Sequence, residues 1–339
     1  MNFFGFTLRG LREYFTKLGE NPAKADIVFD GVYKRGARDF RGFGFSERVA
    51  EKLESALDFG LPRVVERRES ADAAKLLLEL SDGEFVETVL MRQRFGNCVC
   101  VSTQVGCNMG CGFCRSGQLK RRRDLSVEEI VGQVLLISRE FSCDIGGVSV
   151  MGIGEPFDNF DVTADFISIV SDDKGLAVGR RHVTVSTCGI VPKIYEYADL
   201  PKPCSLAISL HAPNDELRSR LMPINKKYPI AEVLKAAEYY TEKTHHRVAL
   251  EYIMLDGVND EDSHARELAD IIAGRDFYVN LIPYNSADSD FHKSGADRVD
   301  SFCRILKESG VIATKRREFG AELKAACGQL RADYFKKDL

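Results

Sequence analysis

The sequence predicts an α/β protein with a mainly parallel sheet, either a barrel or an open wound sheet. Short β-branched runs alternate with helical stretches from about residue 98 onward. A strand–helix–strand repeat at this spacing implies right-handed crossovers, which make consecutive strands parallel. The strand-like runs cover residues 98–103, 148–151, 182–186, 206–210, 248–254, 278–282 and 311–314.

Helical patterns lie between these runs. Ser126 and Glu129 have the spacing of a capping box, and apolar residues at 130, 134 and 137 follow on one face. A second apolar stripe consists of Ile230, Val233, Leu234 and Ala237. These patterns supply the crossover helices that a parallel sheet requires.

The first ninety or so residues differ in composition, because they are rich in charged residues and in residues that favour helices. Val49, Leu53 and Leu57 recur at i, i+4 and i+8, and Pro62 ends this pattern. We therefore expect a small, mostly helical accessory domain at 1–92, followed by the catalytic domain at 93–339.

Composition limits the class of protein. With 44% hydrophobic and 29% charged residues, the 339-residue chain reads as a globular protein with an ample core. The chain shows neither a signal peptide nor an apolar run near the roughly 20 residues that span a bilayer. We expect a cytoplasmic protein without membrane contact. The net charge of −4 does not by itself indicate nucleic-acid binding, although basic residues cluster at 120–123 and 315–317.

Ten cysteines in a chain without an export signal argue against a disulfide framework. Reduced thiols are then available for metal binding or catalysis, or are simply buried. Those with apolar or strand-like neighbours are expected to be inert buried thiols. They are Cys143, Cys188, Cys204 and Cys303.

Glycines and polar residues follow the predicted strands repeatedly. In parallel α/β folds, functional groups collect at the carboxyl ends of the strands. A series of such segments therefore predicts a site better than any one turn does. The segments are 106–107, 152–156, 186–187, 209–211 and 283–285.

Three cysteines, Cys107, Cys111 and Cys114, stand on one of these loops with the spacing C-x3-C-x2-C. Three thiolates do not complete a structural zinc site, but they can hold three irons of a [4Fe-4S] cluster and leave the fourth iron open. The alternatives are zinc with a fourth ligand from Cys98 or Cys100, or three incidental thiols.

This spacing, with Phe113 before the last cysteine, resembles the radical-SAM superfamily. The resemblance implies a partial (β/α)6 barrel and an open iron that chelates S-adenosylmethionine. The segment 154–156 (Gly-Glu-Pro) resembles the superfamily's GGEP-like stretch, which faces the methionine amino group.

Longer stretches are similar to one family, the radical-SAM RNA adenine methyltransferases RlmN and Cfr. The similarity runs from about residue 22 to residue 330. The matching stretches are 100–107, 183–187, 207–215, 222–228, 251–256, 280–285 and 325–330.

The resemblance implies roles for three further residues. Cys327 would carry a methyl group: one S-adenosylmethionine methylates its sulfur, and a second supplies the radical that takes a hydrogen from that methyl. Cys100 would resolve the protein–RNA adduct through a transient disulfide with Cys327. Glu87 matches the proposed proton acceptor.

The family pattern also implies a binding site for S-adenosylmethionine. Serine and asparagine offer hydroxyl and amide groups to its carboxylate, ribose and adenine. The residues that match the pattern are Gly154, Glu155, Ser186, Ser209, Leu210, His211 and Asn285.

The chain departs from the family pattern at residues 115–123, directly after the cysteines. Basic side chains at 120–123 offer contacts to RNA phosphates, which would make binding salt-dependent. Because this loop would lie near the substrate, it leaves the RNA target open.

The resemblance implies methylation of adenine C2 in 23S rRNA, and in some relatives in tRNA, with the accessory domain as a candidate RNA contact. The alternatives are C8 methylation, as in Cfr, and an iron–sulfur RNA-binding protein without methyl transfer. We also expect an external electron donor, such as flavodoxin or ferredoxin, and a monomer.

Overall fold

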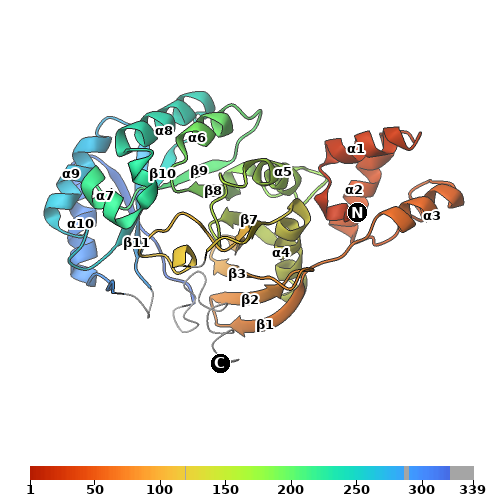
Figure 1. Cartoon of the computed structure of the whole chain (residues 1–339), viewed down its shortest axis with the longest axis horizontal. Coiled ribbons are helices and arrows are strands. Elements are labelled where there is room, and N and C mark those ends of the chain that lie inside the picture. The colour runs from red at the N-terminus through yellow and green to blue at the C-terminus, as the bar shows by residue number, and fades with distance from the viewer. Residues whose placement is uncertain (119, 286–289, 321–339) are drawn as a thin grey trace.

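A ten-stranded sheet with the strand order β1-β2-β3-β4-β7-β8-β9-β10-β11-β12 organises the chain. The structure is a computed structural model that describes residues 1–118, 120–285 and 290–320 (Figure 1). From β4 to β12 each neighbouring pair is parallel, whereas β1, β2, β3 and β4 pair antiparallel. The strands are β1 (Arg63–Glu69), β2 (Ala73–Glu79), β3 (Phe85–Gln93), β4 (Gly96–Cys100), β7 (Ile145–Val150), β8 (Val183–Thr187), β9 (Ser205–Ser209), β10 (Val248–Met254), β11 (Phe277–Pro283) and β12 (Ile312–Lys315).

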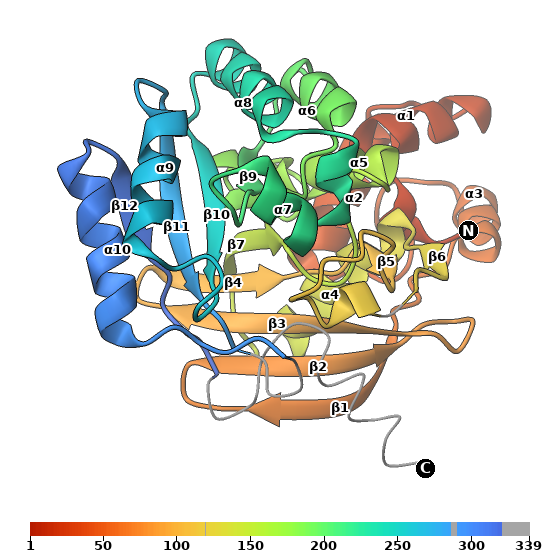
Figure 2. The same cartoon turned by 60° about the vertical axis from the view of Figure 1, so that its left-hand side comes forward.

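Helices cover the outer side of this curved sheet (Figure 2). They are α4 (Val127–Glu140), α5 (Phe160–Ser171), α6 (Val191–Ala198), α8 (Ile230–Thr244), α9 (Asp262–Ile272) and α10 (Ala296–Glu308). The short α7 (Asp215–Leu221) and the 3-10 helix η4 (Pro223–Lys226) follow β9. The predicted capping box opens α4, where the Ser126 backbone N–H donates to Glu129 Oε2 at 2.9 Å.

The predicted fold class is confirmed. Each of the seven predicted strand-like runs overlaps an observed strand, from β4 to β12. The strands are parallel because a crossover helix, packed on the outer face, returns the chain to the same edge each time. β10 is buried along nearly its whole length, as expected for a strand covered on both faces.

Helices occupy the first part of the chain, as predicted: α1 (Leu8–Lys17), α2 (Lys24–Arg35) and α3 (Glu47–Ala56). They pack around aromatic side chains, including the fully buried Phe3, Phe29 and Phe40. Figure 1 shows this helical region beside the sheet.

The prediction of mostly helical structure through residue 92 is wrong beyond α3. Residues 63–93 form β1, β2 and β3, which extend the sheet, and the predicted division at 92/93 falls within β3. β2 consists of alanine, leucine, lysine and glutamate, which are good helix formers. This segment is nevertheless a strand, because β2 pairs with β1 on one edge and with β3 on the other, and this pairing outweighs the helix preference of its residues.

A two-stranded sheet of β5 (Gln104–Val105) and β6 (Arg123–Asp124) closes the loop that carries the three cysteines, and η2 (Ser116–Gln118) lies within that loop. Near the carboxyl end, β12 leads to residues 316–320, the last of the described residues. Among the helices described, none is long and apolar enough to cross a membrane.

Candidate active site

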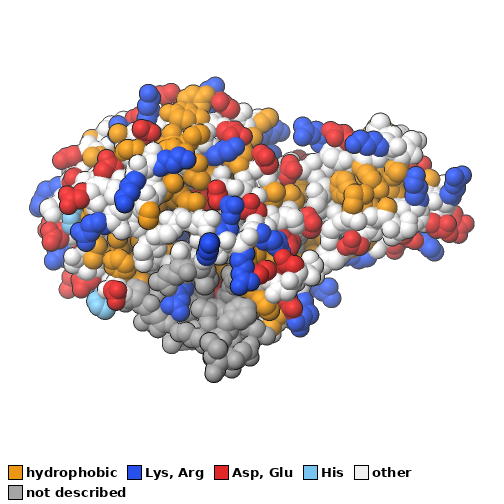
Figure 3. All heavy atoms as spheres, viewed as in Figure 1, with side chains coloured by type: hydrophobic (Ala, Val, Ile, Leu, Met, Phe, Trp, Pro, Cys, Tyr) orange, Lys and Arg blue, Asp and Glu red, His pale blue; other side chains and the backbone are white. Residues whose placement is uncertain are grey.

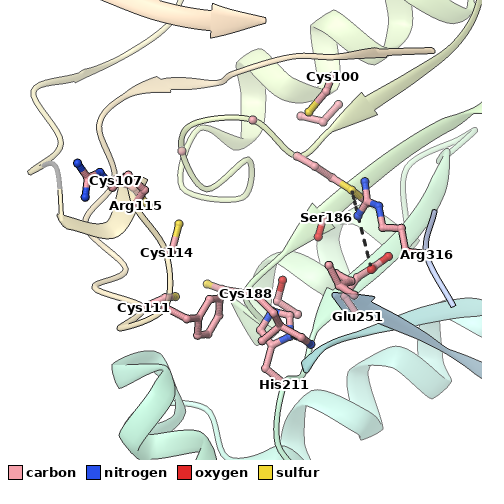
Figure 4. A pocket seen from close by; sticks show the side chains of 18 of the residues that line it. Cys100, Cys107, Cys111, Cys114, Arg115, Ser186, Cys188, His211, Glu251 and Arg316 are labelled. Atoms are coloured by element: carbon pink, nitrogen blue, oxygen red, sulfur yellow. Dashed lines mark hydrogen bonds and ion pairs between the residues drawn. The ribbon is translucent and has the colours of Figure 1, made fainter. Parts of the chain in front are cut away.

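A cavity of about 410 Å³ lies at the carboxyl edge of the parallel strands and extends to β3 and β4. Figure 4 shows side chains from several strands pointing into it, together with the loop of three cysteines. The predicted site residues that line it are Glu87, Cys100, Cys107, Cys111, Cys114, Gly154, Glu155, Ser186, Ser209, His211 and Asn285. Cys327 lies outside the described residues, and Leu210 does not line the cavity.

The cysteine loop is tied to its surroundings by backbone hydrogen bonds. Gly112 N–H donates to the carbonyl of Leu221 at 2.9 Å, and Cys114 N–H donates to the carbonyl of Cys111 at 3.0 Å. Burial raises the pKa of Cys107 to about 12 and also raises that of Cys111. A bound metal reverses this preference, because it deprotonates a coordinating thiol.

The three thiols border one part of the cavity without converging on a point. Within the described residues, no three His, Cys, Asp or Glu side chains are grouped closely enough to hold a single metal ion. A cubic cluster separates its thiolate ligands further than a zinc ion does. Three thiolates on one loop are a donor set that fits three irons of a [4Fe-4S] cluster and leaves the fourth iron open, whereas a structural zinc site takes four ligands.

Glu155 is buried directly beside this loop, and backbone amides hold its carboxylate. Its Oε2 accepts from Cys188 N–H at 2.7 Å, and its Oε1 accepts from Phe157 N–H at 3.0 Å. Burial raises the pKa of Glu155, whereas these hydrogen bonds lower it. The carboxylate thus joins the loops that follow β7 and β8.

Gly154 has a conformation that other residues rarely adopt, with φ of +115°. A Cβ atom at this position would stand 2.7 Å from Cβ of Gln104. The glycine is therefore required for the loop after β7 to approach the strand that precedes the cysteines.

His211 follows β9 with a φ of +62°, and its Nδ1 accepts from Ile253 N–H at 3.1 Å. Burial lowers its pKa to about 3, so the ring is neutral and carries its proton on Nε2. Its ring is nearly perpendicular to that of Phe113 from the cysteine loop, with the ring centres 4.8 Å apart. Leu210 is fully buried in the core and does not line the cavity.

The wall formed by β3 and β4 carries a buried ion pair. Lys75 Nζ lies 2.9 Å from Glu87 Oε2, and the two side chains are 2% and 3% exposed. Ser102 Oγ donates to the Glu87 carbonyl at 2.7 Å. Cys100 lies on the neighbouring strand, and burial raises its pKa while the Arg316 guanidinium lowers it. Glu87 and Cys100 therefore belong to one face of the sheet.

Comparisons with known proteins agree with this geometry. The family described as "Radical SAM superfamily" matches residues 101–269, and "Ribosomal RNA large subunit methyltransferase N-terminal domain" matches residues 1–57. The probable dual-specificity RNA methyltransferase RlmN of Thermoanaerobacter sp. (strain X514) is 44% identical over 340 residues, covering 99% of both chains. That of Bacillus subtilis (strain 168) is 44% identical over 335 residues, covering 97% of this chain and 92% of the relative. The chain belongs to the RlmN family.

A solved structure extends this result to the fold. A radical SAM methyltransferase from Sphaerobacter thermophilus superimposes with a TM-score of 0.89 at 37% identity, covering 97% of this chain and 98% of that one. This RlmN-family chain is thus a radical SAM RNA methyltransferase. A [4Fe-4S] cluster and S-adenosylmethionine are the cofactors that the family implies.

Sequence reasoning missed Glu251, which lies in the middle of β10 and lines the cavity. It accepts from Asn280 Nδ2 at 2.9 Å, and Arg316 stands 3.8 Å away (Figure 4). Burial raises its pKa. The available signal was a single carboxylate between Leu250 and Tyr252 in a strand that is otherwise apolar.

The prediction of inert thiols also needs correction. Cys204 and Cys303 are buried in the core of this RlmN-family protein, whereas Cys143 is only half-buried. Cys188 is buried but lines the cavity, where Figure 4 shows it beside Cys111. It lies one residue past the end of β8, so the strand-end rule pointed to it.

The basic run after the cysteines is engaged in ion pairs. Arg121 pairs with Asp158, Arg122 with Glu84, and Arg123 with Glu129 at 2.8 Å. Phosphate contacts by these residues would require them to exchange carboxylates for phosphates. Figure 3 shows the two charge signs interspersed on the visible face.

Proposed function

We propose that this chain methylates C2 of adenine in 23S rRNA and in tRNA, with Cys327 as the methyl carrier. The observation that carries the proposal is that one cavity is lined by the three-cysteine loop, Cys100 and Glu87 together. The similarity to dual-specificity RNA methyltransferases along nearly the whole chain supports both RNA substrates.

In this proposal Cys107, Cys111 and Cys114 hold the [4Fe-4S] cluster. The binding site for S-adenosylmethionine combines the backbone of Leu210 with Gly154, Glu155, Ser186, Ser209, His211 and Asn285. The cluster, when bound, supplies the electron that cleaves S-adenosylmethionine, and two molecules of the latter are used per turnover. The neutral His211 offers an Nε2–H donor, and the Gly154 turn exposes backbone groups to a ligand.

The other wall performs the proton and sulfur chemistry. Glu87 accepts the proton that leaves the adenine carbon. The Cys100 thiolate attacks the Cys327 sulfur, so that the S–S bond forms as the bond from that sulfur to the methylene carbon on adenine breaks. The electron pair of the broken bond goes to that carbon, which takes a proton to become the methyl group. Support comes from the shared face of Glu87 and Cys100 on β3 and β4, and from Lys75, which keeps the Glu87 carboxylate in place.

Product analysis tests this proposal. The anaerobically reconstituted protein is incubated with S-adenosylmethionine, a reductant, and 23S rRNA or tRNA, and the digested RNA is analysed by mass spectrometry. We expect 2-methyladenosine, whereas 8-methyladenosine would assign the chain the Cfr-type reaction. Neither product from either RNA would refute RNA methylation.

Single cysteine variants test the proposed roles. We expect Cys111→Ala to lose the brown colour of the iron–sulfur cluster together with the product, and Cys327→Ala to retain the colour and lose the product. Cys143→Ala is the matched control, because Cys143 does not line the cavity, and it should retain both. Undiminished product from Cys327→Ala would exclude the methyl-carrier role.

The remaining proposals concern partners. We propose that a flavodoxin or ferredoxin delivers the electron, that the helical region at the amino terminus contacts RNA, and that the protein is a cytoplasmic monomer. The family match at residues 1–57, described by its name as part of a ribosomal RNA methyltransferase, supports the RNA contact. Sedimentation velocity checks the monomer, and RNA binding by a variant lacking residues 1–57 checks the contact.

A further inference from the structure

Arg218 is a fully buried cation on α7, behind the wall of the cavity. Its side chain is 0% exposed, and within the described part of the chain its five hydrogen bonds all go to neutral oxygen atoms. The acceptors are the carbonyls of Leu210 at 3.2 Å, Tyr228 at 3.3 Å, Cys188 at 2.7 Å and Ser209 at 3.1 Å, and Asn225 Oδ1 at 2.8 Å. Such hydrogen bonds satisfy the N–H groups but leave the positive charge in place.

An acidic side chain, Asp215, is linked to Arg218 through one intervening side chain. Asn225, which accepts from Arg218, donates through Nδ2 to Asp215 Oδ1 at 3.0 Å. Asp215 also accepts from Ile230 N–H at 2.8 Å. Burial lowers the pKa of Arg218, but a guanidinium stays protonated in proteins. The charge is therefore permanent and only partly balanced.

This charge lies next to the cysteine loop. The carbonyl of Leu221, at the end of α7, accepts from Gly112 of that loop at 2.9 Å. Cys111 packs against an apolar cluster that includes Leu217 and Leu221, on either side of Arg218 in the sequence. Arg218 Nη2 donates to the carbonyl of Cys188 at 2.7 Å, and Cys188 lies beside Cys111 in Figure 4. Arg218 is therefore directly behind the residues that carry these thiols, although it does not itself line the cavity.

We infer that Arg218 is a positioning residue whose fixed charge makes the cluster on Cys107, Cys111 and Cys114 easier to reduce. The inference rests on the proposed function of these cysteines. Reduction adds one electron, and therefore one negative charge, to a site that already carries thiolates. A permanent cation in a poorly screened interior stabilises the more negative state, and the net charge around a cluster is one determinant of its potential.

A redox titration tests the inference. Holoprotein, Arg218→Gln and Arg218→Lys are titrated anaerobically with dithionite in the presence of mediators, and the reduced cluster is followed by electron paramagnetic resonance. The glutamine variant removes the charge but keeps an amide donor, whereas the lysine variant keeps the charge with fewer donors. At a fixed potential, the ratio of reduced to oxidised cluster should fall on the order of tenfold in Arg218→Gln. For a one-electron couple, a tenfold change is about 59 mV.

The lysine variant separates charge from structure, because we expect it to stay within about twofold of the wild-type ratio. An equal decrease in both variants would show that the hydrogen bonds matter and would overturn the charge role. An unchanged ratio in Arg218→Gln, with full iron content, would overturn it as well. A wild-type protein without any cluster would instead refute the proposed function.

A second variant covers the case in which Arg218→Gln does not fold. Asp215→Asn keeps Arg218 and keeps an oxygen to accept from Ile230 N–H, but it removes the partly balancing negative charge. The ratio of reduced to oxidised cluster should then rise, opposite to the change in Arg218→Gln. A fall, or no change, would contradict the inference.

Discussion

The two walls of the cavity hold their carboxylates in different ways. On the wall of parallel strands, Glu155 accepts from the backbone amides of Cys188 and Phe157. On the antiparallel wall, Glu87 faces the side-chain ammonium of Lys75 at 2.9 Å. Backbone amides are fixed by the fold, whereas the Lys75 ammonium is carried by a long side chain that a single substitution removes. The parallel wall is therefore the more tolerant of substitution.

The difference also bears on chemistry. A carboxylate held by amides is suited to binding a ligand in one orientation. A carboxylate that lines the cavity on the strand next to Cys100 is placed to act as a proton acceptor. Substitutions that remove either the ammonium beside Glu87 or the carboxylate of Glu155 test this comparison of the two walls.

The largest effect is expected for Lys75→Met. The substitution removes the ammonium that faces Glu87, and both side chains are almost fully buried, at 2% and 3% exposed. Breaking a buried pair in this way costs about 3–5 kcal/mol, because one charge stays buried. Urea denaturation of the apoprotein should show a free energy of unfolding lower by this amount.

The double variant Lys75→Met/Glu87→Gln is the control for this prediction. Since it removes the remaining charge, it should recover most of the lost stability. If the double variant is as unstable as Lys75→Met, the loss comes from packing of the lysine stem and not from the charge on Glu87.

A smaller effect is expected for Glu155→Gln on the parallel wall. The amide nitrogen of glutamine would face a backbone N–H, which leaves one buried donor unsatisfied and costs about 1–3 kcal/mol. The dissociation constant for S-adenosylmethionine should rise as well. Isothermal calorimetry and urea denaturation measure the two effects. Glu84→Gln, outside the cavity, is a control that should leave the binding constant unchanged. A larger loss of stability than in Lys75→Met would reverse the comparison of the walls.

The same contrast explains what the sequence could predict. Glu155, Ser186, Ser209 and His211 lie at or just past the ends of parallel strands. Parallel strands place their carboxyl ends along one edge, so correct strand assignment was enough to bring these residues together. Their hydrogen bonds, such as Glu155 to Cys188, depend on loop conformation and were not predictable.

The antiparallel wall could not be predicted from local patterns. Lys75 lies opposite Val89, and Leu77 lies opposite Glu87, so Lys75 and Glu87 are diagonal neighbours across β2 and β3. This register is invisible in a segment that reads as helical. Glu87 and Cys100 were found only through the family resemblance. Arg218 resembles any basic residue of a short helix, because nothing in the neighbouring sequence shows that it is fully buried.

The smallest effect concerns Glu251, which is on the parallel wall but in the middle of its strand. Burial raises its pKa, while Arg316 and the amide of Asn280 lower it, and the net direction is upward. An acid whose folded pKa exceeds its unfolded value binds its proton more tightly in the folded state. The free energy of unfolding then decreases as the pH rises above the ordinary glutamate range, near about 4.3, and through the raised pKa.

Glu251→Gln removes this contribution, so its stability relative to the wild type should increase over that pH window and stay constant above it. Glu155 titrates in both proteins and cancels in the difference. Urea denaturation at a series of pH values measures that difference. A relative stability that decreases with pH would mean that Arg316 outweighs burial. Glu251 would then be held by a side-chain cation, as Glu87 is. The way in which a carboxylate is held would then depend on whether it lies in the middle or at the end of its strand, and not on which wall carries it.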